Sequence, residues 1–178
     1  IEGSMVKSML GRHGISRRLL TKVKFDGGKI MVNGIEKTAI YRLEKGDLVT
    51  ITVPDEPDNE KLIPDDVPLN VLFEDDHYLV VEKPAGKASI TGSLHPTGAM
   101  SNAVKGYISR KNYPNQTVHI ITRLDRDTSG IMFLAKHRYA HSLMYQHKFR
   151  ETLEIRYYSI INDGDLRDSG QIDIPIGR

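Results

Sequence analysis

The 178-residue chain contains no cysteine, which excludes disulfide bonds, thiolate zinc sites and a cysteine nucleophile. A protein without disulfides suits a reducing compartment, so the sequence predicts a cytoplasmic protein. No apolar run approaches the roughly 20 residues that a helix needs to cross a bilayer. The N-terminus also lacks the charged and then apolar pattern of a secretory signal. From these absences we expect neither membrane association nor secretion.

The net charge is low as well. The chain has 25 basic and 23 acidic residues, for a formal net charge of +2, and this balance does not by itself identify a nucleic-acid-binding protein. Hydrophobic residues make up 39% and charged residues 27%, whereas a disordered chain would have fewer aliphatic residues and a larger net charge. The composition therefore predicts a globular protein, and the length suits one medium or two small domains.

Residues 55–69 separate two segments of the chain. This stretch is acidic and contains three prolines, Pro57, Pro64 and Pro68. Because proline fixes φ and removes a backbone donor, we expect an extended linker here. The first four residues, 1–4, resemble a cloning scar and are left out of the expected fold. The predicted organisation is a domain at 5–54, the linker at 55–69 and a second domain at 70–178.

The first segment has the pattern of a small α+β unit. Ile15, Leu19 and Val23 recur every four residues and predict a helix over 15–24. Short strands are predicted at 29–34, which ends in an Asn-Gly turn, and at 49–53. The expected helix also carries four basic residues, Arg17, Arg18, Lys22 and Lys24. They could bind phosphates or form a solvated helix face, and composition does not choose between the two.

Three short motifs in this segment resemble one known family. Gly14-Ile-Ser-Arg-Arg-Leu-Leu20, Gly28-Lys-Ile-Met-Val-Asn-Gly34 and Lys45-Gly-Asp47 are similar to the S4-like RNA-binding domain. In that family a basic helix and the adjoining hairpin bind structured RNA. The resemblance therefore implies an RNA-binding domain at 5–54, and its RNA-contacting residues would be Arg17, Arg18, Lys22 and Lys24.

The second segment mixes helix and strand patterns. We expect a hairpin over 71–83 with its turn at Asp75-Asp76, and the apolar run 131–135 predicts a central strand buried on both faces. Further helices are expected at 102–110 and 137–149, and a further strand at 155–161. The predicted fold class is α+β: a small S4-like domain followed by a mixed, largely antiparallel sheet with flanking helices.

The stretch 122–130, Thr-Arg-Leu-Asp-Arg-Asp-Thr-Ser-Gly, is the richest in chemistry. We expect a loop before a buried strand, a place where catalytic groups often lie. Asp125 stands between Arg123 and Arg126, and positive neighbours favour an ionised carboxylate, which suits a nucleophile. The alternative is a structural cap, in which polar side chains of 127–129 bond loop amides. Residue types alone favour the cap.

A second resemblance changes this balance. Arg123-Leu-Asp-Arg-Asp-Thr-Ser-Gly130 is similar to the signature His-Arg-Leu-Asp-x-x-Thr-Ser-Gly of pseudouridine synthases of the ribosomal large subunit (RluA) type. Four other stretches resemble further motifs of that family, in family order: 72–86, 135–141, 157–161 and 174–178. The resemblance implies a pseudouridine synthase fold over residues 70–178 and an enzyme that isomerises uridine in RNA.

The family implies a role for each matching residue. Asp125 would be the catalytic aspartate, Arg123 would hold or replace the displaced nucleotide, and Tyr157 would pack against the flipped uracil. Uracil leaves its ribose carbon, turns and rejoins through carbon without a net change in atoms, so we expect no cofactor. We also expect no metal, since His137 and His141 lack the glutamate and the third ligand of a zinc motif.

Ribosomal RNA is the expected partner, with transfer RNA as the alternative, and no obligate protein partner is indicated. Three features depart from the family pattern. Thr122 replaces the histidine of the signature, Ile155 replaces a lysine, and the chain stops at Arg178 where the pattern continues, so we expect a truncated catalytic domain. These departures keep open a non-catalytic RNA-binding or ribosome-assembly factor that retains the fold. An aspartate-based glycosidic hydrolase is the third and weaker hypothesis, because it lacks a clear second acid: Asp127 is two residues from Asp125 and need not face the same cavity.

Overall fold

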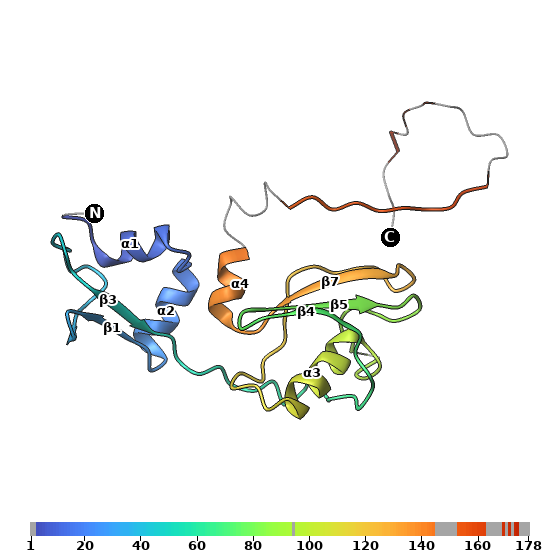
Figure 1. The fold of residues 1–178 in the computed structure, drawn as a ribbon, viewed down its shortest axis with the longest axis horizontal. Helices are drawn as coiled ribbons and strands as arrows, with labels where there is room; N and C mark the ends of the chain where they lie inside the picture. Colours follow the sequence, from blue (N-terminus) through green and yellow to red (C-terminus); the bar gives the residue numbers. More distant parts are fainter. Residues whose placement is uncertain are drawn as a thin grey trace.

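The computed structural model describes residues 3–93, 95–144 and 153–162, together with residues 169, 171, 173 and 174. It contains two β-sheets, each with its own hydrophobic cluster, joined by a segment without helix or strand (Figure 1). Within this part of the chain every pair of neighbouring strands is antiparallel. None of the helices described there is long and apolar enough to cross a membrane.

The N-terminal module, residues 3–53, has two helices and a three-stranded sheet. These elements are α1 (Val6–Arg12), α2 (Arg17–Phe25), β1 (Lys29–Val32), β2 (Ile35–Glu36) and β3 (Val49–Thr52), with the sheet order β2-β1-β3. Leu19 and Val23 of α2 are buried in one cluster with Ile30 and Val32 of β1, as the four-residue spacing predicts. The predicted helix and strands are confirmed, and α1 is an additional helix.

The N-terminal module begins before Met5. The amide of Gly3 donates to the carbonyl of Leu43 at 2.8 Å, and the amide of Leu43 donates to the carbonyl of Ser4 at 2.9 Å. The guanidinium of Arg42 also donates to the carbonyl of Gly3 at 2.8 Å. Gly3 and Ser4 are therefore part of the fold, although we expected residues 1–4 to lie outside it.

The C-terminal module, residues 70–144, has a four-stranded sheet and two helices. The elements are β4 (Val71–Glu74), β5 (Tyr78–Lys83), α3 (Met100–Arg110), β6 (His119–Ile120), β7 (Gly130–Ala135) and α4 (Arg138–Met144), with the sheet order β4-β5-β7-β6. One face of the sheet packs on α3 through a cluster that contains Leu79, Val81, Met132 and Leu134. The predicted hairpin is confirmed, since the carboxylate of Asp75 accepts from the amides of His77 and Tyr78 in the turn.

Two expectations for this region are wrong. Strand β7 is central, but it is not buried on both faces, because Met132 is fully buried while Ile131 is 63% exposed. Residues 155–161 form no strand, since branched and aromatic residues make a strand only where a neighbouring strand supplies hydrogen-bond partners. Of the helix expected at 137–149, α4 accounts for the residues up to Met144, and the remainder lies outside the described residues.

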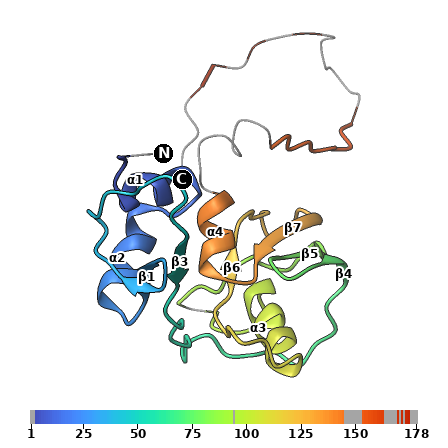
Figure 2. The same ribbon diagram turned by 60° about the vertical axis from the view of Figure 1, so that its left-hand side comes forward.

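The linker, residues 55–69, contains no helix or strand, as its prolines predict. It nevertheless follows the surface of the C-terminal module through specific bonds. The ammonium of Lys105 binds the carboxylate of Asp58 at 2.5 Å, and the amide of Asp65 donates to the carbonyl of Asn102 at 3.0 Å. Helix α4 lies between the N-terminal module and the second sheet (Figure 2). The two modules are therefore joined by contacts as well as by the chain.

Candidate active site

Asp125 lies on the loop that joins β6 to β7. Where this loop leaves the sheet, the amides of Ile121 and Thr122 both donate to the carbonyl of Phe133, at 2.9 and 3.2 Å. The hydroxyl of Thr122 accepts from the amide of Phe133 at 2.9 Å. At the other end Gly130 has φ of 140°, a conformation that favours glycine. Both ends of the loop are thus fixed to β7.

A buried lysine supports the loop from inside the fold. Lys83, the last residue of β5, has no exposed surface. Its ammonium donates to the carbonyl oxygens of Pro84, Arg126 and Thr128, at 2.9, 2.8 and 2.6 Å. All three donors of the lysine are therefore used. Because two of the three acceptors lie one and three residues after Asp125, Lys83 fixes the backbone next to the carboxylate.

Ser89 clamps the residue that precedes Asp125. Its side chain is nearly buried, and its hydroxyl donates to the carbonyl of Leu124 at 2.5 Å and accepts from the amide of Leu124 at 3.0 Å. One hydroxyl thus holds both polar groups of this residue. The guanidinium of Arg126 adds a bond to the carbonyl of Gly86 at 3.2 Å. The stretch after β5 therefore holds the loop on both sides of the aspartate.

The side chain of Asp125 is exposed on this fixed loop. Its backbone carbonyl accepts from the amide of Thr128 at 3.2 Å. Its carboxylate makes no hydrogen bond or ion pair with any other residue that the structure describes, so it is not used to tie down its own loop. The flanking arginines do not pair with it either. Burial lowers the pKa of Lys83, and the negative charges of Asp127 and Asp125 oppose that shift.

An open groove runs beside the loop and along the less buried face of β7. Arg123 and Tyr157 both line it, together with apolar side chains that include Ile131 and Phe133. Tyr157 is 64% exposed, and Asp125 is not among the lining residues. The structure therefore brings two of the three predicted site residues to one groove, with the aspartate on the loop at its border.

The four basic residues of α2 have different surroundings. Arg17 and Lys24 are exposed, and the ammonium of Lys24 lies 4.7 Å from the ring centre of Phe25. Lys22 forms an ion pair with Asp26 at 3.0 Å. Arg18 is exposed as well. Burial, the positive charge of His119 and, after these, that of Arg18 lower the pKa of His141 on α4. Three of the four predicted basic residues are therefore exposed, and the fourth, Lys22, is paired with an acid at the end of the same helix.

The sequence profile of the RNA pseudouridylate synthase family matches residues 77–178, which is more than half of the chain and includes the whole Asp125 loop. The chain belongs to this family. It is 41% identical over 173 residues to the RNA pseudouridine synthase YjbO of Bacillus subtilis, an alignment that covers 97% of this chain and 61% of that relative. It is 33% identical over 153 residues to ribosomal large subunit pseudouridine synthase D of Pseudomonas aeruginosa, covering 85% of this chain and 46% of the relative.

A protein of the same name from Xanthomonas campestris is 36% identical over 119 residues, covering 65% of this chain and 34% of the relative. The chain therefore spans between about a third and three fifths of the length of these pseudouridine synthases. Membership in the RNA pseudouridylate synthase family agrees with the position of the signature, which forms the exposed and well-anchored loop around Asp125.

Sequence reasoning missed the two side chains that anchor the pseudouridine synthase signature. Lys83 lies in the stretch 72–86, which resembles the first family motif, so a signal was present. Its partner Thr128 is 45 positions away, and no local pattern joins them. Ser89 lies outside the matching motifs, and nothing in its neighbourhood predicts that it binds Leu124, 35 positions away.

Proposed function

We propose that the complete protein isomerises uridine to pseudouridine in structured RNA, with Asp125 as the nucleophile. The observation that supports this is an exposed carboxylate on a loop whose backbone is fixed by Lys83 and Ser89. A catalytic group accelerates a reaction most when its position is fixed before the substrate binds, since misplacement by about 1 Å can lower the rate roughly 100-fold. The loop of Asp125 meets that requirement without a bound ligand.

The carboxylate acts at the bond between the ribose C1′ and N1 of uracil. The carboxylate bonds to C1′ as the C1′–N1 bond breaks, the uracil turns within the site, and C5 then bonds to C1′ as the bond from C1′ to the carboxylate breaks. The proton that C5 loses is balanced by the proton that N1 gains, so the product is an isomer of the substrate. A carboxylate that is ionised and exposed can supply the negative charge that this step uses. No redox cofactor or energy source enters the balance.

The target uridine reaches the carboxylate after extrusion from the folded RNA, which costs a few kcal/mol and is offset by stacking and base-edge contacts. Arg123 and Tyr157 line one groove beside the Asp125 loop. In the proposed complex the guanidinium of Arg123 takes the place of the extruded base in the stack, and the ring of Tyr157 packs on the uracil.

The N-terminal module is proposed to be an S4-like RNA-binding domain, followed by the linker at 55–69 and the catalytic part from residue 70. Its exposed basic residues on α2, Arg17 and Lys24 first among them, would contact RNA phosphates. Ribosomal RNA is the proposed substrate, because two relatives carry the name ribosomal large subunit pseudouridine synthase D.

The test replaces Asp125 by alanine in the full-length protein. The matched control is Asp127→Ala, which removes the same charge from an exposed position two residues away on the same loop. Pseudouridine is mapped in total RNA from cells that carry the wild type, either variant or no protein. We expect D125A to lose its target pseudouridine entirely and D127A to retain most of it.

A second readout separates the enzyme from a non-catalytic factor that retains the fold. The wild type and D127A are expected to form a stable complex with RNA that contains 5-fluorouridine, and D125A is expected to bind the same RNA only reversibly. Pseudouridine that persists at its site in cells carrying D125A would show that Asp125 is not the nucleophile. RNA binding by all three proteins without any modification would favour the non-catalytic factor.

A further inference from the structure

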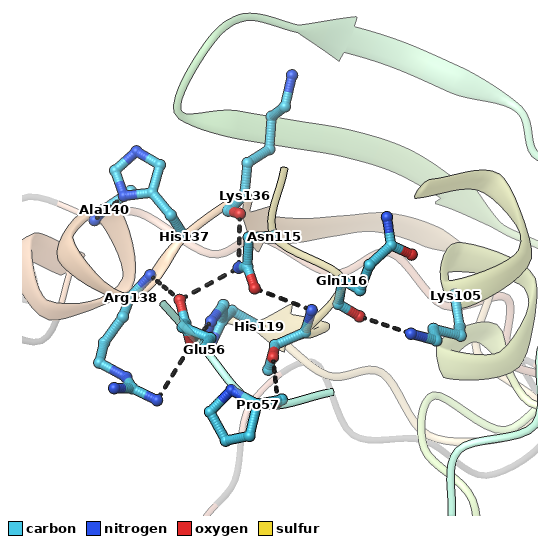
Figure 3. Close-up of polar contacts among 11 residues, drawn as sticks. Glu56, Pro57, Lys105, Asn115, Gln116, His119, Lys136, His137, Arg138 and Ala140 are labelled. Carbon is cyan, nitrogen blue, oxygen red and sulfur yellow. Dashed lines mark hydrogen bonds and ion pairs between the residues drawn. The ribbon is translucent and has the colours of Figure 1, made fainter. Parts of the chain in front are cut away.

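A buried carboxylate in the linker binds the C-terminal module at several points. The side chain of Glu56 is only 5% exposed. One carboxylate oxygen accepts from the amide of Arg138 at 2.8 Å and from the side-chain amide of Asn115 at 3.1 Å. The other lies 2.8 Å from Nε2 of His119 and 3.2 Å from the guanidinium of Arg138 (Figure 3). The carboxylate is thus surrounded by donors from three segments of the C-terminal module.

These partners keep the Glu56 carboxylate charged. Burial alone would raise the pKa of Glu56, but the hydrogen bond and positive charge of His119, with those of Arg138, outweigh burial and hold the pKa below its usual value. A buried ion that loses its partners is strongly destabilising, whereas one fully supplied with donors is tolerated. The Glu56 carboxylate therefore has one favourable position, where these donors converge. If it were displaced, the carboxylate and its partners would remain buried without hydrogen bonds.

Helix α4 connects this contact to the N-terminal module. Arg138, the first residue of α4, binds Glu56. Further along the same helix, the hydroxyl of Ser142 donates to the carbonyl of Gly14 at 2.9 Å and accepts from the amide of Ser16 at 3.2 Å. The hydroxyl of Tyr139 donates to the carbonyl of His13 at 2.9 Å. One short helix thus holds the linker at its start and the entry to α2 beyond it.

The Asp125 loop and the helix that contacts the N-terminal module, α4, lie at opposite ends of strand β7. Strand β7 begins at Gly130, directly after the Asp125 loop, and ends at Ala135, just before α4 (Figure 1). Its six residues span about 20 Å in an extended strand. An RNA that touches α2 and also presents a base to Asp125 must therefore bridge this length, and its fit depends on the angle between the two modules.

We propose that Glu56 is a positioning residue that fixes the N-terminal module relative to the Asp125 loop, so that structured RNA meets both as one rigid surface. The part of this inference that concerns RNA rests on the proposed function. When the N-terminal module is already fixed, RNA binding does not have to restrict the motion of that module. Once the RNA contacts one of the two sites, α2 or the Asp125 loop, its contact with the other forms at high effective concentration. Without Glu56 the module is held by its contacts with α4 and by the remaining linker bonds, such as that of Asp58 with Lys105, and it turns more freely relative to the sheet.

The first experiment measures the orientation directly. The chain has no cysteine, so nitroxide labels can be placed at two exposed positions by the substitutions Thr21→Cys on α2 and Lys111→Cys after α3. Double electron–electron resonance spectroscopy then reports the distribution of distances between the two labels. We expect one narrow distribution for the parent protein and a clearly broader one for Glu56→Ala. Glu60→Ala, an exposed acid in the same linker, is the matched control and should keep the narrow distribution.

The second experiment measures RNA binding. The probe is ribosomal RNA from cells that lack this protein, and the dissociation constant is obtained by filter binding. We expect Glu56→Ala to raise Kd and KM roughly three- to tenfold, while kcat at saturating RNA stays within about twofold because no catalytic group has moved. Glu56→Gln retains the shape without the charge and should fall between wild type and alanine. Arg138→Met removes the partner instead and should match E56A, which gives a second route if E56A folds poorly.

A narrow distribution in both E56A and R138M, or an unchanged Kd in both, would overturn the role of Glu56. A loss of kcat with unchanged Kd would also contradict it, since that pattern belongs to the catalytic loop. Failure of the proposed function has a different signature: the wild type itself would form no pseudouridine, while the label distances and the Kd values would still decide the role of Glu56.

Discussion

Replacement of Lys83 by methionine tests the central physical claim about the candidate active site. Methionine has a similar length but carries no donor, so the carbonyl oxygens of Pro84, Arg126 and Thr128 would lose their common partner. A buried polar group left without a hydrogen bond costs about 1–3 kcal/mol. The removal of a buried charge offsets part of this cost. We therefore expect the free energy of unfolding to fall by about 2–4 kcal/mol.

The effect on catalysis should exceed the effect on RNA binding. Because Lys83 binds the carbonyls of residues 126 and 128, its loss frees the backbone next to Asp125, and misplacement by about 1 Å can reduce the rate roughly 100-fold. The assay combines urea unfolding with kcat and KM for pseudouridine formation, at a temperature where the variant is folded. We expect kcat to fall by about one to two orders of magnitude with a smaller change in KM.

The matched control for this experiment is Lys87→Met. Lys87 is a partly exposed lysine four residues away, and its ammonium has no hydrogen bond or ion pair with the residues that the structure describes. The Lys87→Met substitution should change neither the free energy of unfolding nor kcat appreciably. If Lys83→Met unfolded at the same urea concentration as the wild type and kept its kcat, the loop would not depend on the buried lysine, and the account of the site given above would be wrong.

Two further predictions concern the buried hydroxyls of Ser89 and Ser101 and the carboxylate of Glu74. Ser89→Ala should lower the free energy of unfolding by about 1 kcal/mol and should lower kcat more than it raises KM. The control, Ser101→Ala, removes a buried hydroxyl without a partner among the described residues and should be neutral or stabilising. Equal effects of the two substitutions would show that the bonds between Ser89 and Leu124 do not support the loop. Burial alone would raise the pKa of Glu74, but bonds from Tyr107, Tyr113 and Lys136 lower it from 4.5 to about 2. Its contribution to stability is therefore complete above pH 4.5 and is lost as the pH falls towards 2. Glu74→Gln should be less stable than the wild type at neutral pH, and its free energy of unfolding should fall less steeply with decreasing pH. Parallel curves of stability against pH for the two proteins would contradict this.

The helices and strands with clear local patterns could be predicted from the sequence. The spacing of Ile15, Leu19 and Val23 predicts α2, because three or four residues bring side chains to one face of a helix. The Asn-Gly turn predicts the β1–β2 hairpin, and Asn33 and Gly34 both have positive φ there. The signature around Asp125 was equally visible, and it indicated both the loop and the family. In each case the determining interactions lie within a few residues of one another.

The tertiary structure decided what supports these elements. Ile131 has the composition of a buried strand residue, yet it is 63% exposed, because burial depends on what packs against that face of β7. Residues 155–161 have the composition of a strand, but a strand also needs a partner for its backbone. The loop after Asp125 also depends on a distant residue, because the buried Lys83 of β5 binds two of its carbonyl oxygens.

The sequence by itself determined the family and the position of its signature, since the residues around position 125 are contiguous and their pattern is local. The tertiary structure determined which residues hold the Asp125 loop and the linker in place. Lys83 meets Thr128 across 45 positions, Ser89 meets Leu124 across 35, and Glu56 meets Arg138 across 82. The physical reason is that a hydrogen bond requires a separation of about 3 Å in space, and only the folded chain decides which distant residues come that close.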